Sequence, residues 1–157
     1  KKTKDPTVRI HSSCLTGDLM GSQKCDCGYQ LETALDYMSK SKKMNILIYL
    51  NQEGRGLGIH NKIISYNIQE KGWDTYQADN ILGFSGDERD YKAAAEILKF
   101  FRVKELNLIT NNPEKVEYLK KNKITVNKMI KIKPGINPHN KKYLETKKII
   151  GKHLLNL

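Results

Sequence analysis

Apolar residues recur along the chain with two different spacings, which together predict alternating strands and helices. Strands are expected at Val8–His11, Asn45–Leu50 and Glu105–Ile109, and the continuous run NILIYL of the second is typical of a strand buried on both faces. Asn112-Pro113 predicts the start of a helix, because proline at the first helical position gives up no hydrogen bond. Apolar positions with helical spacing are Leu31, Ala34, Leu35 and Met38; Leu57, Ile64 and Ile68; Ala94, Ala95, Leu98 and Phe101; and Val116 and Leu119.

This alternation predicts the fold class: an α/β protein, a single domain with a mixed, mainly parallel central sheet flanked by helices. A length of 157 residues is enough for one domain, and the chain contains no internal repeat or low-complexity linker. The tail, residues 131–157, opens with the loop KIKPGINPHN and is expected to end in a helix, Tyr143–His153. No apolar run approaches the ~20 residues that cross a bilayer, so we expect no membrane partner.

The formal net charge of +11 is concentrated in the C-terminal third of the chain. Residues 1–100 carry 14 basic and 13 acidic side chains, whereas residues 101–157 carry 14 basic and 4 acidic ones. This asymmetry describes either a lysine-rich solvated surface or a face for a polyanion such as nucleic acid or a triphosphate. Lysine outnumbers arginine 24 to 4, yet Arg9, Arg55 and Arg89 fall in polar stretches. Arginine there suggests a need for a planar bidentate donor, as at a phosphate or a purine edge.

The three cysteines lie close together in the sequence, as C-x10-C-x-C at Cys14, Cys25 and Cys27. Three thiolates without an obvious fourth ligand predict a tetrahedral Zn²⁺ site that keeps one position open for water. Two other interpretations stay open: three buried and inert thiols, or a structural site in which His11 is the fourth ligand. An odd number of cysteines cannot form a closed set of disulfides, so a reduced, cytoplasmic location is expected.

Polar and glycine-rich clusters follow the predicted strands, where ligands bind in α/β proteins. The segment 52–58 (QEGRGLG) comes directly after NILIYL and allows the backbone to approach a ligand closely. The segment 83–90 (GFSGDERD) places Asp87 and Arg89 two residues apart, which suggests a proton acceptor beside a phosphate-binding arginine. Asp87 or Asp90 could instead cap the next helix. Thr110–Lys115 repeats the arrangement of strand end, polar loop and helix start.

Four stretches of the chain resemble GTP cyclohydrolase II, an enzyme family of riboflavin biosynthesis: VRIHSSCLTGDLMGSQKCDCGYQL, NQEGRGLGIHNKIISYNIQEKGWDT, LGFSGDERDY and LITNNPEK. The similarity runs from Val8 to Lys115 nearly without a break, and NPHNKKYLETKKIIGKHLL resembles the tail of the family. The resemblance implies hydrolytic opening of the imidazole ring of GTP with release of formate and pyrophosphate. The product would be 2,5-diamino-6-ribosylamino-4(3H)-pyrimidinone 5′-phosphate. It also implies Zn²⁺ and Mg²⁺ as cofactors and a homodimer.

The resemblance assigns roles to individual residues of this sequence. Cys14, Cys25 and Cys27 would bind zinc, Asp87 would accept a proton, Arg89 would attack the α-phosphorus, and Tyr66 would assist the second hydrolysis near the zinc and the purine. The residues that would bind GTP are Arg9, Ile10, His11, Ser12, Ser13, Gln30, Glu53, Gly54, Arg55, Thr75, Thr110 and Lys115. A second interpretation of Arg89 stays open: a protonated guanidinium is a poor nucleophile, and an arginine beside a phosphate stabilises charge.

The sequence departs from the family pattern at two points. Ser13 stands where the family most often has glutamate, which predicts a changed contact near the metal or the phosphates. The family's first strand or two is missing before Lys1, so residues 1–157 are interpreted as a GTP cyclohydrolase II domain that lacks this part.

Two alternative functions are kept beside the leading one. The first is a paralogous cyclohydrolase that stops at the formamide, and the presence of Tyr66 argues against it. The second is a zinc-containing nucleic-acid-binding module that uses the basic C-terminal third. That third has few aromatic residues on which bases could stack, so we expect no nucleic-acid partner.

Overall fold

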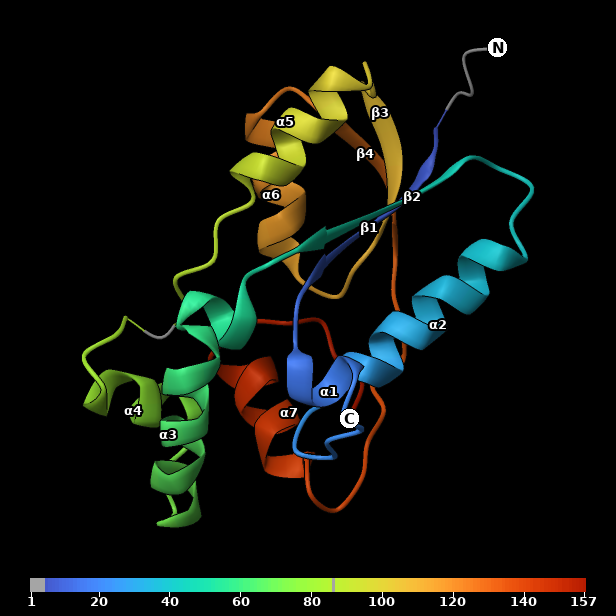
Figure 1. The fold of residues 1–157 in the computed structure, drawn as a ribbon. Helices are drawn as coiled ribbons and strands as arrows, with labels where there is room; N and C mark the ends of the chain where they lie inside the picture. The colour runs from blue at the N-terminus through green and yellow to red at the C-terminus, as the bar shows by residue number, and fades with distance from the viewer. Residues whose placement is uncertain (1–4, 86) are drawn as a thin grey trace.

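A four-stranded parallel sheet forms the centre of the computed structural model, which describes residues 5–85 and 87–157 (Figure 1). Its strands are β1 (Thr7–Ser12), β2 (Asn45–Leu50), β3 (Glu105–Ile109) and β4 (Thr125–Ile130), in the order β2-β1-β3-β4. The expected α/β class and parallel sheet are confirmed, and every strand pair within the described residues is parallel. Gly86, in the predicted cluster 83–90, and residues 1–4 lie outside the described part.

Helices connect the strands. They are α1 (Leu15–Asp18), α2 (Cys27–Ser39), α3 (Gly58–Glu70), α4 (Thr75–Ile81), α5 (Lys92–Phe100), α6 (Pro113–Lys121) and α7 (Lys141–Ile149), with a 3-10 turn at Glu53–Gly56. The predicted start at Asn112-Pro113 is confirmed, because the Asn112 side chain accepts the Glu114 N–H and caps α6. In the described residues, no helix is long and apolar enough to cross a membrane.

Alternating side chains of β1 face two different environments. Val8 and Ile10 are fully buried in the main hydrophobic core, which α5 and α6 complete with residues such as Leu98 and Leu119. A smaller apolar cluster on the opposite face joins Ala34 and Met38 of α2 to Ile109 and Ile132. Arg9 lies on this second face, where it contacts Gln30 of α2. One face of the central strand is therefore apolar core, and the other buries polar side chains under α2.

The prediction that β2 is buried on both faces is wrong. β2 is an edge strand, so Leu47 and Tyr49 are 39% and 48% exposed while Ile48 and Leu50 are buried in the main core. The central position belongs to β1 and β3, and an apolar run does not reveal which strand occupies the centre of a sheet. Two helix predictions also differ. Phe101, counted among the helical positions, lies after the end of α5 and is 64% exposed, and the helix expected at Tyr143–His153 is α7 at Lys141–Ile149.

The strand order creates a crevice at the carboxyl ends of β1 and β3. From β1 the chain crosses to β2 on one side, and later returns to β3 on the other side of β1. The connecting helices α2 and α6 lie on opposite faces, so the loops after β1 and β3 diverge and leave a space between them. The helices α3, α4 and α7 gather beyond these strand ends (Figure 1). Ligands bind at such a reversal of strand order in α/β sheets.

We expect Leu108→Ala to lower the free energy of unfolding by about 2–5 kcal/mol, because Leu108 is fully buried in the main core and its loss leaves a cavity. Leu47→Ala, on the exposed face of the edge strand, should cost about 1 kcal/mol or less. Urea titration of both variants measures the difference. Equal losses would contradict the one-sided burial of β2.

Candidate functional site

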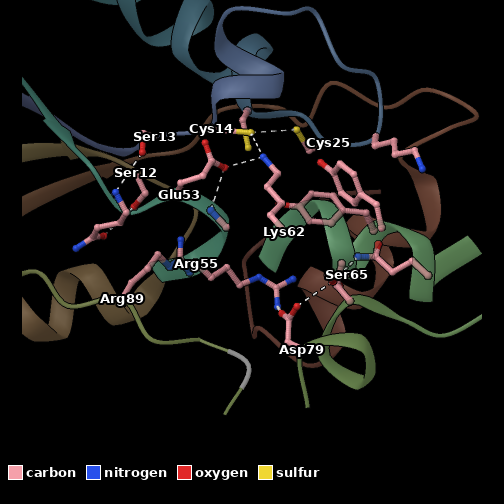
Figure 2. A pocket seen from close by; sticks show the side chains of 18 residues that line it. Ser12, Ser13, Cys14, Cys25, Glu53, Arg55, Lys62, Ser65, Asp79 and Arg89 are labelled. Carbon is pink, nitrogen blue, oxygen red and sulfur yellow. Dashed lines mark hydrogen bonds and ion pairs between the residues drawn. The ribbon is translucent and has the colours of Figure 1, made fainter. Parts of the chain in front are cut away.

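Two adjoining pockets lie at the carboxyl ends of the strands. We call the first the thiol pocket; it is lined by the three cysteines together with Ser12, Ser13, residues 52–55 and parts of α3, α4 and α7 (Figure 2). The second, the basic pocket, is lined by Arg9, His11, Gln30, residues 110–112, Lys115, Lys147 and His153, among others. The residues that line both pockets are Ser12, Cys27, Arg55, Arg89 and Tyr143. The two pockets are therefore parts of one continuous site.

The three cysteine sulfurs converge within the thiol pocket. All of the Sγ atoms lie within 4.8 Å of one another, and those of Cys14 and Cys25 are 3.7 Å apart. Cys14 follows the end of β1, whereas Cys27 is the first residue of α2. The loop between them passes close to the sulfurs at Gly17, where an added Cβ would lie 2.9 Å from Cys25 Sγ and 3.0 Å from Cys14 Sγ. The fold thus keeps this space free for the thiols.

Close approach of the thiols shifts their ionisation in opposite directions. Hydrogen bonding from Cys25 and Cys27, together with Lys62, lowers the pKa of Cys14, while hydrogen bonding with Cys14 raises the pKa of Cys25 to about 11. The same crowding raises the pKa of Cys27. Three thiolates this close repel one another unless a cation lies between them. This donor set suits Zn²⁺, and no further His, Cys, Asp or Glu of the described residues joins the cluster, so a fourth position stays open.

His11 supports the cysteine loop and does not belong to the thiol cluster. Arg9 can only donate, so Nδ1 of His11 accepts from its guanidinium at 3.2 Å, and Nε2 then donates to Asp18 at 3.1 Å. Burial and the charge of Arg9 lower the pKa of His11 to about 4, which keeps the ring neutral. Asp18 also accepts the backbone N–H of Cys14 at 3.0 Å. The alternative of His11 as the fourth metal ligand is not supported, since both ring nitrogens already have partners.

The basic pocket concentrates buried donors without carboxylates. Within the described residues, its lining includes Arg9, Arg55, Arg89, Lys115 and Lys147, and no Asp or Glu. Burial, together with neighbouring cations, lowers the pKa of Lys115 well below its usual range. Buried charges are costly unless an opposite charge compensates them. The lining therefore favours an anionic ligand.

Orphaned polar atoms mark the same two pockets. Within residues 5–85 and 87–157, the buried side-chain atoms that lack a hydrogen-bond partner are Arg9 Nε, Thr75 Oγ1 and Asn112 Nδ2. Arg9 and Asn112 line the basic pocket, and Thr75 lines the thiol pocket. An unpaired buried polar group costs about 1–3 kcal/mol, so such groups point to a ligand that completes their bonding. The amino terminus of α6, directly after Asn112, adds backbone N–H groups and a favourable dipole for an anion.

Two loops after β2 meet and bring two arginines to the boundary between the pockets. Glu88 N donates to the carbonyl of Arg55 at 3.0 Å, and a Cβ on Gly56 would lie 3.1 Å from the Glu88 backbone. Arg89 donates to both carboxylate oxygens of Asp87, through Nε at 2.8 Å and through Nη2. Arg55 donates to Asp79 at 3.2 Å, and its guanidinium lies 4.2 Å from the centre of the Tyr76 ring. Each arginine is thus held in a fixed orientation by a carboxylate.

Most of the predicted site residues line the two pockets, with two exceptions. The side chain of Ile10 is buried in the main core, and only its carbonyl, which accepts from Lys115 Nζ at 2.8 Å, faces the site. Asp87 lines neither pocket, but it accepts a hydrogen bond from Arg89, which lines both. Ser13 lines the thiol pocket, and its Oγ accepts the backbone N–H of Gln52 at 3.1 Å.

Several residues that line the pockets come from α3 and the tail and were not predicted from the sequence. Lys62 of α3 lines the thiol pocket, and Tyr143, Lys147 and His153 bring the tail against the basic pocket. Lys147 reaches Asp26, between two of the cysteines, at 3.4 Å. The sequence signals for the tail were the basic excess of residues 101–157 and the resemblance of NPHNKKYLETKKIIGKHLL to the family's tail, and neither singled out these residues. Lys62 had none, because it is one of 24 lysines.

Comparison with known proteins shows the family to which the chain is similar. The family model for GTP cyclohydrolase II matches residues 1–131. The chain is 49% identical to GTP cyclohydrolase-2 of Helicobacter pylori (strain P12) over 154 residues, which is 98% of this chain and 78% of that protein. It is 50% identical to GTP cyclohydrolase-2 of Helicobacter acinonychis (strain Sheeba), with 96% of this chain and 77% of that protein covered. GTP cyclohydrolase-2 of Blochmanniella pennsylvanica (strain BPEN) is also 50% identical, over 91% of this chain and 72% of that protein.

We expect Gly17→Ala to lower the zinc content of the purified protein well below one ion per chain, because the new Cβ would displace the sulfurs of Cys14 and Cys25. Metal analysis after dialysis measures it, and circular dichroism checks the fold. The matched control is Gly21→Ala in the same loop, where a Cβ meets nothing within 4 Å but φ is +67°. That variant should lose about 1 kcal/mol of stability and keep its zinc. Full zinc occupancy in Gly17→Ala would show that the thiols do not need the space beside Gly17.

Proposed function

The chain belongs to the GTP cyclohydrolase II family, and from this we propose that it opens the imidazole ring of GTP by hydrolysis, releasing formate and pyrophosphate. The product would be 2,5-diamino-6-ribosylamino-4(3H)-pyrimidinone 5′-phosphate, formed in the first step of riboflavin biosynthesis. The observation that carries the proposal is the continuity of the three-thiol pocket with a carboxylate-free basic pocket. GTP offers an electron-poor ring carbon to the first pocket and a triphosphate to the second.

The thiol pocket is the proposed site of ring opening. Cys14, Cys25 and Cys27 would hold Zn²⁺, which when bound supplies the Lewis acidity that makes water a nucleophile near neutral pH. Tyr66 and Thr75 line the same pocket and would orient the purine. Thr75 supports this assignment because its buried Oγ1 lacks a partner within the described residues and is available to a polar atom of the ligand.

The basic pocket is the proposed site of the triphosphate. Arg9 Nε and Asn112 Nδ2 are buried donors that lack partners in the described part of the chain, and a phosphate oxygen would satisfy them. Lys115, whose lowered pKa reflects burial among other cations, would regain its full charge beside an anion. Mg²⁺ would offset the phosphate charge that remains, and omission of Mg²⁺ from the assay tests this.

Arg89 is proposed to hold the α-phosphate electrostatically and not to attack it. Burial alone would lower the pKa of Arg89, but its bonds to Asp87 outweigh burial and raise that pKa. Burial would likewise raise the pKa of Asp87, yet Arg89 holds it below its usual value. A guanidinium kept protonated in this way is a weak nucleophile and a strong charge stabiliser. Asp87 would become a proton acceptor only once a phosphate draws Arg89 away.

The tail is proposed to belong to the same domain, so that residues 1–157 form one GTP cyclohydrolase II domain. Tyr143 lines both pockets, and Lys147 lines the basic pocket while its Nζ lies 3.4 Å from Asp26. The backbone N–H of Leu154 donates to the carbonyl of Asn111 at 2.9 Å, beside the start of α6. Removal of residues 131–157 should therefore abolish GTP binding, which equilibrium dialysis would measure.

A cytoplasmic homodimer is proposed as the working form of the protein. An interface is supported by exposed apolar side chains on two neighbouring segments: Leu19 and Met20 after α1, and Leu47 and Tyr49 on β2. The two segments adjoin each other, because the Tyr49 hydroxyl donates to Asp18 of α1. Three free thiols in one cluster support a reducing compartment. Sedimentation equilibrium tests the dimer, and cell fractionation tests the location.

We expect incubation of the purified protein with GTP and Mg²⁺ to yield formate, pyrophosphate and a diaminopyrimidine nucleotide, resolved by mass spectrometry. Removal of zinc with a chelator should stop formate production, and added zinc should restore it. A product that keeps its formyl group would instead identify the paralogous enzyme that stops at the formamide. Absence of turnover together with tight RNA or DNA binding would favour the nucleic-acid alternative.

We expect Arg89→Lys to reduce kcat/KM by at least about 100-fold, nearly as much as Arg89→Ala, because the forked guanidinium and its fixed position are lost although the charge is kept. The matched control is Arg102→Lys, at an exposed arginine away from both pockets, which should leave turnover unchanged. Formate and pyrophosphate are measured separately for each variant. Near-normal turnover of Arg89→Lys would show that a point charge is sufficient.

A further inference from the structure

Lys62 is a buried cation next to the thiol cluster that the proposed chemistry does not use. It extends from α3 into the thiol pocket, and its Nζ lies 3.0 Å from Cys14 Sγ (Figure 2). The same nitrogen lies 2.9 Å from Thr16 Oγ1 and 2.7 Å from Glu53 Oε1. Its side chain is 11% exposed. All three N–H donors of the ammonium group therefore have an acceptor, and one of those acceptors is a sulfur.

Glu53 holds Lys62 in place through a second hydrogen bond, beside the one to the sulfur. Glu53 Oε1 accepts from Lys62 and from the backbone N–H of Gly54 at 3.0 Å, and Oε2 accepts the backbone N–H of Leu15. Both carboxylate oxygens are thus used within the protein, which makes Glu53 an anchor and leaves it little capacity to contact a ligand. Figure 2 shows Lys62 linked to both Glu53 and Cys14.

The negative charges of the thiolates and of Glu53 favour a cation at the position of Lys62. Three thiolates around Zn²⁺ leave a net charge of minus one, and the buried carboxylate of Glu53 is a further negative group beside them. The ammonium group contacts both negative groups, since its Nζ lies 2.7 Å from Glu53 Oε1 and 3.0 Å from Cys14 Sγ. An N–H donor on a thiolate withdraws electron density from the sulfur, so the metal keeps more of its Lewis acidity.

We propose that Lys62 is a positioning residue of the metal centre, which donates a hydrogen bond to the Cys14 thiolate and balances its charge, with Glu53 as its anchor. The assignment rests on the proposed function only in taking the three cysteines as metal ligands. It differs from a role in GTP binding, because all three N–H donors of Lys62 have acceptors within the protein.

The test replaces zinc by Co²⁺ and compares wild type with Lys62→Met, which keeps the length of the side chain and removes the donor. We expect the thiolate-to-cobalt absorption band of Lys62→Met to move to lower energy, since a sulfur without its hydrogen bond is more easily oxidised. We also expect the zinc-loaded variant to be alkylated by iodoacetamide several-fold faster than wild type, at Cys14. Lys62→Arg, which can still donate, should restore both properties in large part.

The matched control is Lys24→Met. Lys24 lines the same pocket and lies 4.9 Å from the centre of the Tyr66 ring, but its Nζ binds Glu70 at 2.8 Å and contacts no sulfur. Its cobalt spectrum and alkylation rate should equal those of wild type. Where Lys62→Met does not fold, as judged by circular dichroism, Lys62→Gln takes its place. Glutamine keeps an N–H donor but not the charge, so this variant should be alkylated faster than wild type and Lys24→Met, and its cobalt band should move in the direction expected for Lys62→Met, by less. A wild-type band and rate in Lys62→Gln would count against the assignment.

An unchanged cobalt band and alkylation rate in Lys62→Met would overturn the assignment, and a rise in KM for GTP with an unchanged spectrum would show that Lys62 contacts the substrate instead. The spectral comparison needs no turnover. Failure of wild type to open GTP would therefore count against the proposed function alone, whereas failure to bind Co²⁺ through the cysteines would overturn both.

Discussion

Mutual repulsion among three thiolates is the constraint on which the site depends, since their sulfurs lie within 4.8 Å of one another. Several features of the chain reduce this repulsion or make room for the sulfurs. Gly17 leaves room for the sulfurs, Cys27 begins α2, where the helix dipole favours negative charge, and Lys62 places an ammonium group against Cys14. These features come from three separate segments, so the cluster exists only once α1, α2 and α3 have packed together.

A continuous set of hydrogen bonds then ties the cysteine loops to the basic pocket. Lys147 of the tail lies beside Asp26, Asp26 accepts from Gln30, and Gln30 accepts from Arg9. Arg9 continues the set through His11 to Asp18, which holds the backbone of Cys14. Arg9 and His11 can take part because β1 alternates, with Val8 and Ile10 turned to the core. A strand with one apolar face thus gives its other face to the ligand site.

Local pattern predicted some elements of the fold well and others poorly, for identifiable reasons. The run at Glu105–Ile109 and the start at Asn112-Pro113 were found because each carries its own signal. β4 was missed because its sequence TVNKMI alternates with polar and charged residues at the edge of the sheet. NILIYL was expected to be buried on both faces because all its residues after Asn45 are apolar, yet the strand order puts it at the other edge, where Leu47 and Tyr49 are exposed.

The sequence by itself determined the α/β class, the cysteine cluster and the loops at the strand ends, since C-x10-C-x-C and the stretches around Arg55 and Arg89 are contiguous patterns. Only the tertiary structure decided that Ile10 presents its carbonyl and not its side chain, and that Lys62 lies against a sulfur 48 residues away. It also decided that the tail closes the basic pocket. The physical reason is that a contact between distant residues depends on how helices pack on the sheet, and no local spacing records that packing.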